Sequence, residues 1–209
     1  CWDGYANDGA GGHATELTEW KDTSGRYSFV FAENSGIEVD GNALLFPGTQ
    51  TGYAKLSSTD TDVTFELAKN GTVEIVLVAS DEKVSQSVAL QSSSQSGIAF
   101  GALARASAEV DANLVTSIGS RPLTPCNWSA EFGTFATTYT SASSQDTWVN
   151  GGKVTKTGSD NFGTAANETY LGHRANLASG QAFQGRIYAI RLYSTKLTEA
   201  QIAANHAVD

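Results

Sequence analysis

The clearest alternation of apolar and polar positions lies near the end of the chain, in the segment FQGRIYAIRLY at residues 183–193. Ile187, Ala189 and Arg191 are expected on one face and the residues between them on the other, because side chains alternate along a strand. By the same rule, Arg186 and Arg191 are expected on opposite faces, with Arg191 buried against an acidic partner. The segment is therefore predicted to be a strand within a sheet.

A short helix is predicted directly after this strand. Thr198 occupies an N-cap position and Gln201 follows at the spacing of a capping box. Leu197 before the cap and Ile202 after it have the spacing of a hydrophobic staple. The helix is thus expected to begin after Thr198 and to pack through Ile202.

The rest of the chain predicts short strands joined by turns. Thr72–Ala79 is almost continuously apolar, as expected of a central strand that is buried on both faces. Asn150 and Gly151 stand between two β-prone runs, and this pair favours the positive φ angles of a type I′ hairpin turn. Ser85–Ser96 is predicted to be a weak strand or a loop over a sheet edge. Further strands are expected over Glu19–Asp22, Ala43–Phe46, Val63–Leu67, Gly97–Leu103, Glu109–Ser117, Glu131–Tyr139, Thr169–Gly172 and Ala182–Tyr193.

Composition supports one all-β domain over residues 1–209. Only 17% of the residues are charged and 21 are glycines, which suits short strands and turns better than long helices. The net charge of −9 disfavours nucleic acid as a partner, and no apolar stretch is long enough for membrane insertion. Because the chain contains no methionine, we expect a processed form or a domain of a longer protein.

Several segments together resemble one family. They are WDGYAN at residues 2–7, the G-x-H of Gly11-Gly12-His13, WKDTSG at 20–25, FATTY at 135–139 with WVNG at 148–151, TYLG at 169–172, and the closing F-x-G-x-I strand with its L-T-x-x-Q-I helix. Their order is similar to that of concanavalin A-like, laminin-G-like jelly-roll domains, with an opening like that of bacterial members in which Thr23 replaces the usual Leu. The resemblance implies a two-sheet antiparallel β-sandwich with one short C-terminal helix. Trp20 and Trp148 fall within these segments and are expected in the core.

An enzyme is not expected. Glycosidases of the concanavalin A-like fold set paired carboxylates on one strand face as E-x-D-x-x-E. Glu38-Val39-Asp40 and Glu109-Val110-Asp111 lack the last Glu, since Ala43 and Leu114 stand at those positions. A glycoside hydrolase without that motif remains a remote alternative.

A structural calcium ion is one reading of the opening segment. Asp3, Asn7, Asp8 and Asp22 offer the oxygen ligands that calcium prefers. The alternative is turn capping, because Asp and Asn side chains also accept hydrogen bonds from nearby backbone N–H groups. The residues leave both readings open.

Candidate ligand-binding residues lie in two other polar loops and in the opening segment. Trp128 follows a loop-like stretch, and an exposed Trp or Tyr5 offers a flat face to a sugar ring. His173, Arg174 and Asn176 follow a predicted strand and are able to donate hydrogen bonds to sugar hydroxyls. The alternatives are core packing for the aromatic residues and a solvated loop for the polar ones.

The family resemblance implies a non-catalytic binding module on a secreted or cell-surface protein, with a glycan as its ligand and binding like that of a lectin. The alternative is a structural or adhesive module that binds a surface protein. The sequence does not fix the oligomeric state. Cys1 and Cys126 either form a disulfide or are two separate thiols.

Overall fold

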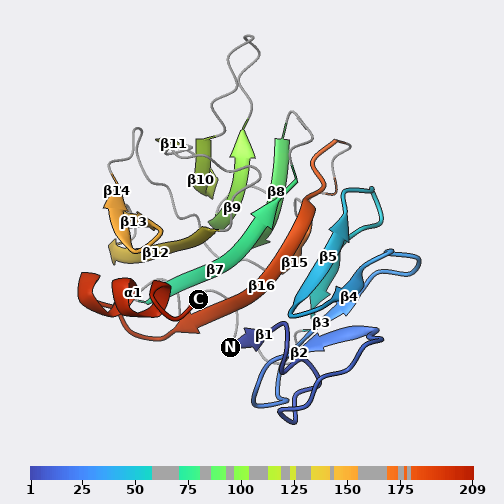
Figure 1. Cartoon of the computed structure of the whole chain (residues 1–209). Coiled ribbons are helices and arrows are strands. Elements are labelled where there is room, and N and C mark those ends of the chain that lie inside the picture. The colour runs from blue at the N-terminus through green and yellow to red at the C-terminus, as the bar shows by residue number, and fades with distance from the viewer. Residues whose placement is uncertain are drawn as a thin grey trace.

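Two antiparallel sheets packed face to face make up the fold, with one short helix in the described part of the chain (Figure 1). The computed structural model describes residues 1–57, 71–80, 86–92, 97–103, 113–118, 123–125, 133–141, 144–154, 169–173, 177 and 180–209. This architecture confirms the expected all-β sandwich. In the same ranges, no helix has both the length and the apolar character needed to span a membrane.

The first sheet, sheet A, contains eight strands in the order β14-β13-β12-β7-β16-β5-β4, with β1 paired to β16. Its strands are Trp2–Asp3 (β1), Glu38–Asp40 (β4), Ala43–Pro47 (β5), Thr72–Ala79 (β7), Gly133–Ser141 (β12), Ser144–Val149 (β13), Gly152–Val154 (β14) and Gln184–Tyr193 (β16). Strands β7 and β16 lie in the middle, and β4 lies at one end.

The second sheet, sheet B, also contains eight strands, in the order β11-β10-β9-β8-β15-β6-β3-β2. Its strands are Glu19–Lys21 (β2), Ser28–Phe31 (β3), Ala54–Leu56 (β6), Gln86–Ser92 (β8), Gly97–Leu103 (β9), Asn113–Ile118 (β10), Leu123–Pro125 (β11) and Thr169–Leu171 (β15). The segment expected to be a weak edge strand or loop forms β8, which pairs on both sides with β9 and β15. The strand expected at Val63–Leu67 falls outside the described residues.

The hydrophobic core lies between the sheets. Strand β7 sends Val73, Ile75 and Leu77 into it, and its other face carries Thr72 and Glu74. Nearly all of β7 is buried, as expected from its continuous apolar run, because the outer face of sheet A is also covered. The cover is the helix α1 (Glu199–His206), which shares a second apolar cluster with sheet A; the members of that cluster are Ala136, Trp148, Leu197 and Ile202.

The expected strict alternation along β16 is wrong by one residue. The pairing register with β7 shifts between Ile187 and Ala189, as it does at a β-bulge. As a result, both Ile187 and Ile190 point into the core. The bulge also corrects the expected placement of the arginines: Arg186 pairs with Val78 and Arg191 with Glu74, so both lie on the outer face.

The helix and a hairpin hold each other in place. Thr198 accepts a hydrogen bond from the backbone N–H of Gln201, and the predicted capping box is confirmed. Asn150 and Gly151 have φ angles of 50° and 75°, as the predicted type I′ turn requires. A Cβ atom on Gly151 would lie 3.2 Å from the Cα atom of Ala203, so the glycine also allows the turn to approach the helix closely.

Candidate functional site

A buried asparagine fixes the N-terminal loop, which we define as residues 4–18. Asn7 is fully buried, and its Nδ2 donates hydrogen bonds to the carbonyl oxygens of Gly4 at 3.1 Å and Ala14 at 3.0 Å. Its Oδ1 accepts a hydrogen bond of 2.8 Å from the backbone N–H of Ala14. Because these bonds join the two ends of one excursion of the chain, the loop is held in a defined shape.

Asp22 closes the next turn. It is only 5% exposed, and its Oδ1 accepts hydrogen bonds of 2.9 Å from the backbone N–H groups of both Arg26 and Tyr27. Its Oδ2 accepts a 2.7 Å bond from the Ser24 hydroxyl. Burial alone would raise the pKa of Asp22, but the hydrogen bonds from Ser24 and Tyr27 lower this pKa below its ordinary value.

Asp3 and Asp8 also cap turns. Oδ1 of Asp3 accepts hydrogen bonds from the backbone N–H groups of Tyr5 and Ala6, and Oδ1 of Asp8 accepts them from Ala10 and Gly12. The bonds from Ala10 and Gly12 lower the pKa of Asp8. These four polar residues therefore each have the local role that turn chemistry gives to Asp and Asn.

Calcium binding by Asp3, Asn7, Asp8 and Asp22 stays a prediction. Within the described ranges, no three side chains of His, Cys, Asp or Glu come together as metal ligands. Backbone and amide oxygens also bind calcium, so a chelator experiment is the direct test. A lower melting temperature with chelator would show a bound cation, since a ligand of the native state stabilises it by mass action.

An exposed aromatic pair stands on the N-terminal loop. The rings of Tyr5 and His13 stack with centroids 4.9 Å apart and planes 12° from parallel, and Tyr5 is 56% exposed. Nδ1 of His13 lies 3.0 Å from the carbonyl oxygen of Tyr5, which ties the second ring to the backbone of the first. This Tyr5–His13 platform presents a flat face whose orientation is set before any ligand arrives.

A groove lies at the edge of the sandwich, beside the N-terminal loop. It has a volume of about 330 Å³ and runs between the loop, strand β3 and strand β4 with the preceding Ile37. Its lining residues are Thr15, Glu16, Leu17, Phe31, Ile37, Glu38 and Val39. Thr15, Glu16 and Leu17 of this edge groove belong to the same N-terminal loop as the Tyr5–His13 platform.

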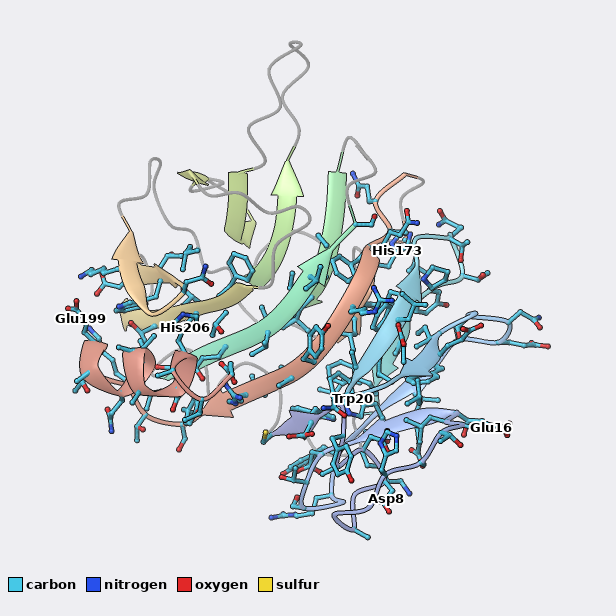
Figure 2. The ribbon with its side chains drawn as sticks, viewed as in Figure 1. Asp8, Glu16, Trp20, His173, Glu199 and His206 are labelled. Atoms are coloured by element: carbon cyan, nitrogen blue, oxygen red, sulfur yellow. The ribbon has the colours of Figure 1, made fainter. Side chains whose placement is uncertain are left out.

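Of the expected ligand residues, the structure describes Tyr5 and His173. His173 is completely buried, and its ring meets that of Tyr53 edge-on with centroids 6.3 Å apart. Figure 2 shows His173 away from Asp8 of the N-terminal loop. Ligand contact through His173 stays a prediction, and Trp128, Arg174 and Asn176 lie outside the described residues.

The other tryptophans of the family-like segments are core residues, as expected. Trp20 is fully buried, and its Nε1 donates a 2.9 Å hydrogen bond to the carbonyl oxygen of Asp3. Trp148 is buried beneath the helix in the second apolar cluster. Cys1 is an exposed free thiol, while Cys126 lies outside the described residues.

A cluster of charges is buried at the other end of the molecule, between sheet A and α1. Glu74 accepts hydrogen bonds from Asn205 at 2.9 and 3.1 Å and from the Tyr193 hydroxyl at 3.3 Å. Arg191 lies 3.7 Å from the Glu74 carboxylate and also forms an ion pair with Asp209. The expected acidic partner of Arg191 is thus present, while the Arg191 side chain itself is 21% exposed and only partly buried. We call these five residues the helix-end cluster.

The helix-end cluster is enclosed rather than open to a ligand. The Glu74 side chain is 0% exposed and that of Asp209 is 4% exposed. Burial raises the pKa of Glu74, although hydrogen bonding to Asn205 and the charge of Arg191 oppose this effect. Burial and the nearby Glu74 charge raise the pKa of Tyr193 to about 12. The cluster therefore binds the helix to the sheet.

Two features of the candidate site were not predicted from the sequence. Tyr5 was proposed as a ligand residue without His13, because nothing in their spacing shows that the Asn7 hydrogen bonds bring the rings together. The edge groove combines residues from three separate segments, which only the folded topology places side by side. Glu74 did carry a signal, since it is the one charged residue within the apolar run Thr72–Ala79.

No protein-family model matches this sequence. None of the curated protein sequences matches it either.

Solved structures do resemble it. The binding domain of Paraclostridial Mosquitocidal Protein 1 has a TM-score of 0.69 at 12% identity, over 91% of this chain and 50% of that chain. Trypanosoma rangeli sialidase in complex with sialic acid has a TM-score of 0.67 at 14% identity, over 93% of this chain and 31% of that chain. The native heptameric SAP-like pentraxin from Limulus polyphemus has a TM-score of 0.55 at 14% identity, over 77% of this chain and 79% of that chain.

At these identities the likeness concerns the fold alone. The chain spans about a third of the sialidase and half of the mosquitocidal binding-domain structure. Membership of the laminin-G-like family stays a prediction. The chain has a β-sandwich fold of the concanavalin A-like class, which it shares with a pentraxin and with a toxin's binding domain.

Proposed function

We propose that this chain is a non-catalytic carbohydrate-binding module of a secreted or cell-surface protein, and that it binds glycans in the manner of a lectin. The observation that carries the proposal is the Tyr5–His13 platform, an exposed aromatic stack on a loop fixed by Asn7. A sugar ring has one apolar face, which packs on an aromatic ring, and a rim of hydroxyls that need hydrogen-bond partners. On the same loop, Oδ2 of Asp8 is the proposed acceptor for a sugar hydroxyl, since Oδ1 already accepts hydrogen bonds from Ala10 and Gly12.

The fold supports the same proposal. Solved structures with this fold include a sialidase in complex with sialic acid, a pentraxin and a toxin's binding domain. The matched part of the sialidase is about a third of that chain, so its likeness is partial. A small platform gives weak single-site binding, and several copies on one parent protein would raise the avidity.

A glycan array with the purified chain tests the proposal, and the bound family then serves for titration. Replacing Tyr5 by Ala should weaken binding about tenfold, which corresponds to about 1.4 kcal/mol. Tyr5→Phe keeps the ring and should retain most of the affinity. Val208→Ala is the matched control, because Val208 is also an exposed apolar residue but belongs to the other end of the chain. A blank array, or equal binding by Tyr5→Ala, would remove the proposal.

Trp128, His173, Arg174 and Asn176 remain proposed ligand residues. They are tested by alanine substitution against the same glycan family. If Trp128→Ala binds as the wild type does, its proposed role is withdrawn while the Tyr5–His13 platform stands.

The non-catalytic part of the proposal concerns the two E-x-D pairs, of which the structure describes the one in β4, while Glu109 and Asp111 lie outside the described residues. Asp40 is held by Arg186 in an ion pair of 2.6 Å, and Glu38 lies at the rim of the edge groove. What supports this part is the sequence, in which neither E-x-D pair is followed by the third carboxylate of the E-x-D-x-x-E pattern that glycosidases of this fold use. Release of reducing sugar from the glycan that the array identifies would contradict this part and favour the hydrolase alternative.

A structural or adhesive role is the alternative that a blank array would favour. The pentraxin with this fold is heptameric, so self-association is the relevant form of that alternative. Light scattering after size exclusion would then show whether the chain forms a defined oligomer.

A further inference from the structure

We propose that the edge groove is a second binding site, and that it takes an extended, positively charged segment of a partner protein. Aliphatic side chains of that segment would enter the floor of the groove, and its lysines or arginines would lie against Glu16 and Glu38. This site is separate in chemistry from the Tyr5–His13 platform, which presents an aromatic face rather than a charged rim.

The floor of the groove is apolar. Leu17, Phe31 and Val39 are partly exposed and pack against the main core, and Ile37 is 9% exposed at its margin. The two sheets end here with β4 and β2, so the side chains between them are covered less completely than those in the middle. A volume of about 330 Å³ falls in the range of sites that bind small groups or a few side chains.

The backbone beside the floor is suited to strand addition. Strand β4 is the last strand of sheet A, and within the described ranges it pairs with β5 only. The outer edge of such a strand presents backbone N–H and C=O groups that an extended peptide is able to pair with. Alternate side chains of an added strand point to one face, so every second residue would reach the groove.

The acidic rim of the groove favours a partner segment with positive charge. Glu16 and Glu38 are exposed, and no residue that lines the groove is basic. The neighbouring cations are already paired, Lys21 with Glu19 at 3.2 Å and Arg186 with Asp40 at 2.6 Å. The whole chain carries a net charge of −9, so a cationic segment is attracted from a distance and an anionic one is repelled.

The probe is a capped six-residue peptide in which lysine and valine alternate. Its binding to the intact chain is followed by fluorescence anisotropy at low salt. We expect saturable binding that weakens with added salt, because the charges on the rim are exposed. Two control peptides separate the contributions: one alternates glutamate and valine, and one has three lysines followed by three valines. Both should bind at least several-fold more weakly.

Single-charge variants locate the site. Glu38→Gln and Glu16→Gln should each weaken the lysine–valine peptide about threefold, as expected for exposed charge pairs. Glu199→Gln is the matched control, since it removes the same charge at the opposite end of the molecule (Figure 2), and should leave the affinity unchanged. Hydrogen exchange gives an independent readout, because an added strand should slow exchange of backbone amides in Glu38–Asp40.

Several results would overturn the proposal. They are absence of binding at about 1 mM peptide, equal binding of the glutamate–valine peptide, and equal loss with Glu199→Gln. Concentration-dependent dimers that Glu38→Gln abolishes would instead show that a second copy occupies the edge. If Glu38→Gln weakens glycan binding while the peptide does not bind, the groove belongs to the glycan site and this proposal is wrong.

Discussion

The two ends of the sandwich are closed in different ways. At the N-terminal end, backbone groups satisfy Asn7, and backbone groups together with the Ser24 hydroxyl satisfy Asp22, while aromatic and acidic side chains remain on the surface. In the helix-end cluster, Arg191 pairs with Glu74 and Asp209, and both carboxylates are shielded from water. Glu16 and Glu38 at the N-terminal end are exposed, whereas the carboxylates of Glu74 and Asp209 at the helix end are enclosed.

The difference teaches that polar residues near one another do not by themselves indicate a binding site. The helix-end cluster contains a carboxylate, a guanidinium and a phenol hydroxyl, groups that are also common in active sites. Because Glu74 is buried, the cluster has a structural role here. The N-terminal loop has simpler groups, and its backbone hydrogen bonds free the Tyr5–His13 platform for contact. Substitutions at the two ends should therefore affect stability and binding differently.

The largest effect is expected from Arg191→Ala. This change leaves Glu74 buried without its cation, and breaking a buried pair costs about 3 kcal/mol. For a domain of this size, the melting temperature should fall by roughly 6–12 °C. Arg186→Ala is the control on the same face of the same strand; its ion pair with Asp40 is exposed, so it should cost less than about 1 kcal/mol. If Arg191→Ala and Arg186→Ala lower the melting temperature equally, the predicted difference between the two ion pairs is wrong.

The next effect is expected from Asn7→Ala. The change removes three side-chain hydrogen bonds from a fully buried site, and we expect a loss of about 2 kcal/mol. Glycan binding should weaken as well, because the loop no longer holds Tyr5 in place. Asn42→Ala, at an exposed asparagine, should change neither property. Urea unfolding measures the stability and glycan titration measures the affinity. If Asn7→Ala is destabilised but binds glycan as the wild type does, the Tyr5–His13 platform does not depend on the Asn7 hydrogen bonds.

A smaller effect is expected from Thr198→Ala. Loss of the capping box should cost about 1 kcal/mol and leave glycan and peptide binding unchanged. Thr198→Ser keeps a hydroxyl and should recover most of the stability. Altered binding in Thr198→Ala would show that the two ends are coupled, contrary to this account.

The smallest effect concerns pH and Glu74. Since burial raises its pKa above the ordinary value of 4.5, the folded chain holds this proton more tightly than the unfolded chain does. The resulting stabilisation is fully present below pH 4.5 and is lost as the pH rises through the pKa of the folded state. Relative to Glu74→Gln, the wild type should thus lose stability between pH 4.5 and neutral pH in urea titrations. A difference that stays constant, or that favours the wild type as pH rises, would be the contrary result.

Much of the fold could be predicted from local patterns, and the candidate site could not. The run Thr72–Ala79, the Asn150-Gly151 turn and the Thr198 cap each carry their information within a few residues. The bulge between Ile187 and Ala189 depends on packing across the sheet, so alternation alone placed Arg191 on the face of Ile187 and apart from Arg186.

The platform and the groove depend on contacts between distant segments. Tyr5 and His13 meet because the Asn7 side chain closes the loop between them. Phe31 and Val39 share a groove with Leu17 only because sheets A and B end at the same side of the sandwich. The sequence offered the residue types for a sugar-binding surface but not their arrangement.

The central claim is that the N-terminal end binds a glycan while the helix end does not. The most direct measurement is an NMR titration of the intact chain with the glycan that the array identifies, in which the ring resonances of Tyr5 and His13 are followed beside those of Tyr193 and His206. We predict saturable shifts at Tyr5 and His13 with one common affinity, and none at Tyr193 and His206. Shifts confined to the helix end, or no shift at Tyr5 with a glycan that binds, would contradict the account.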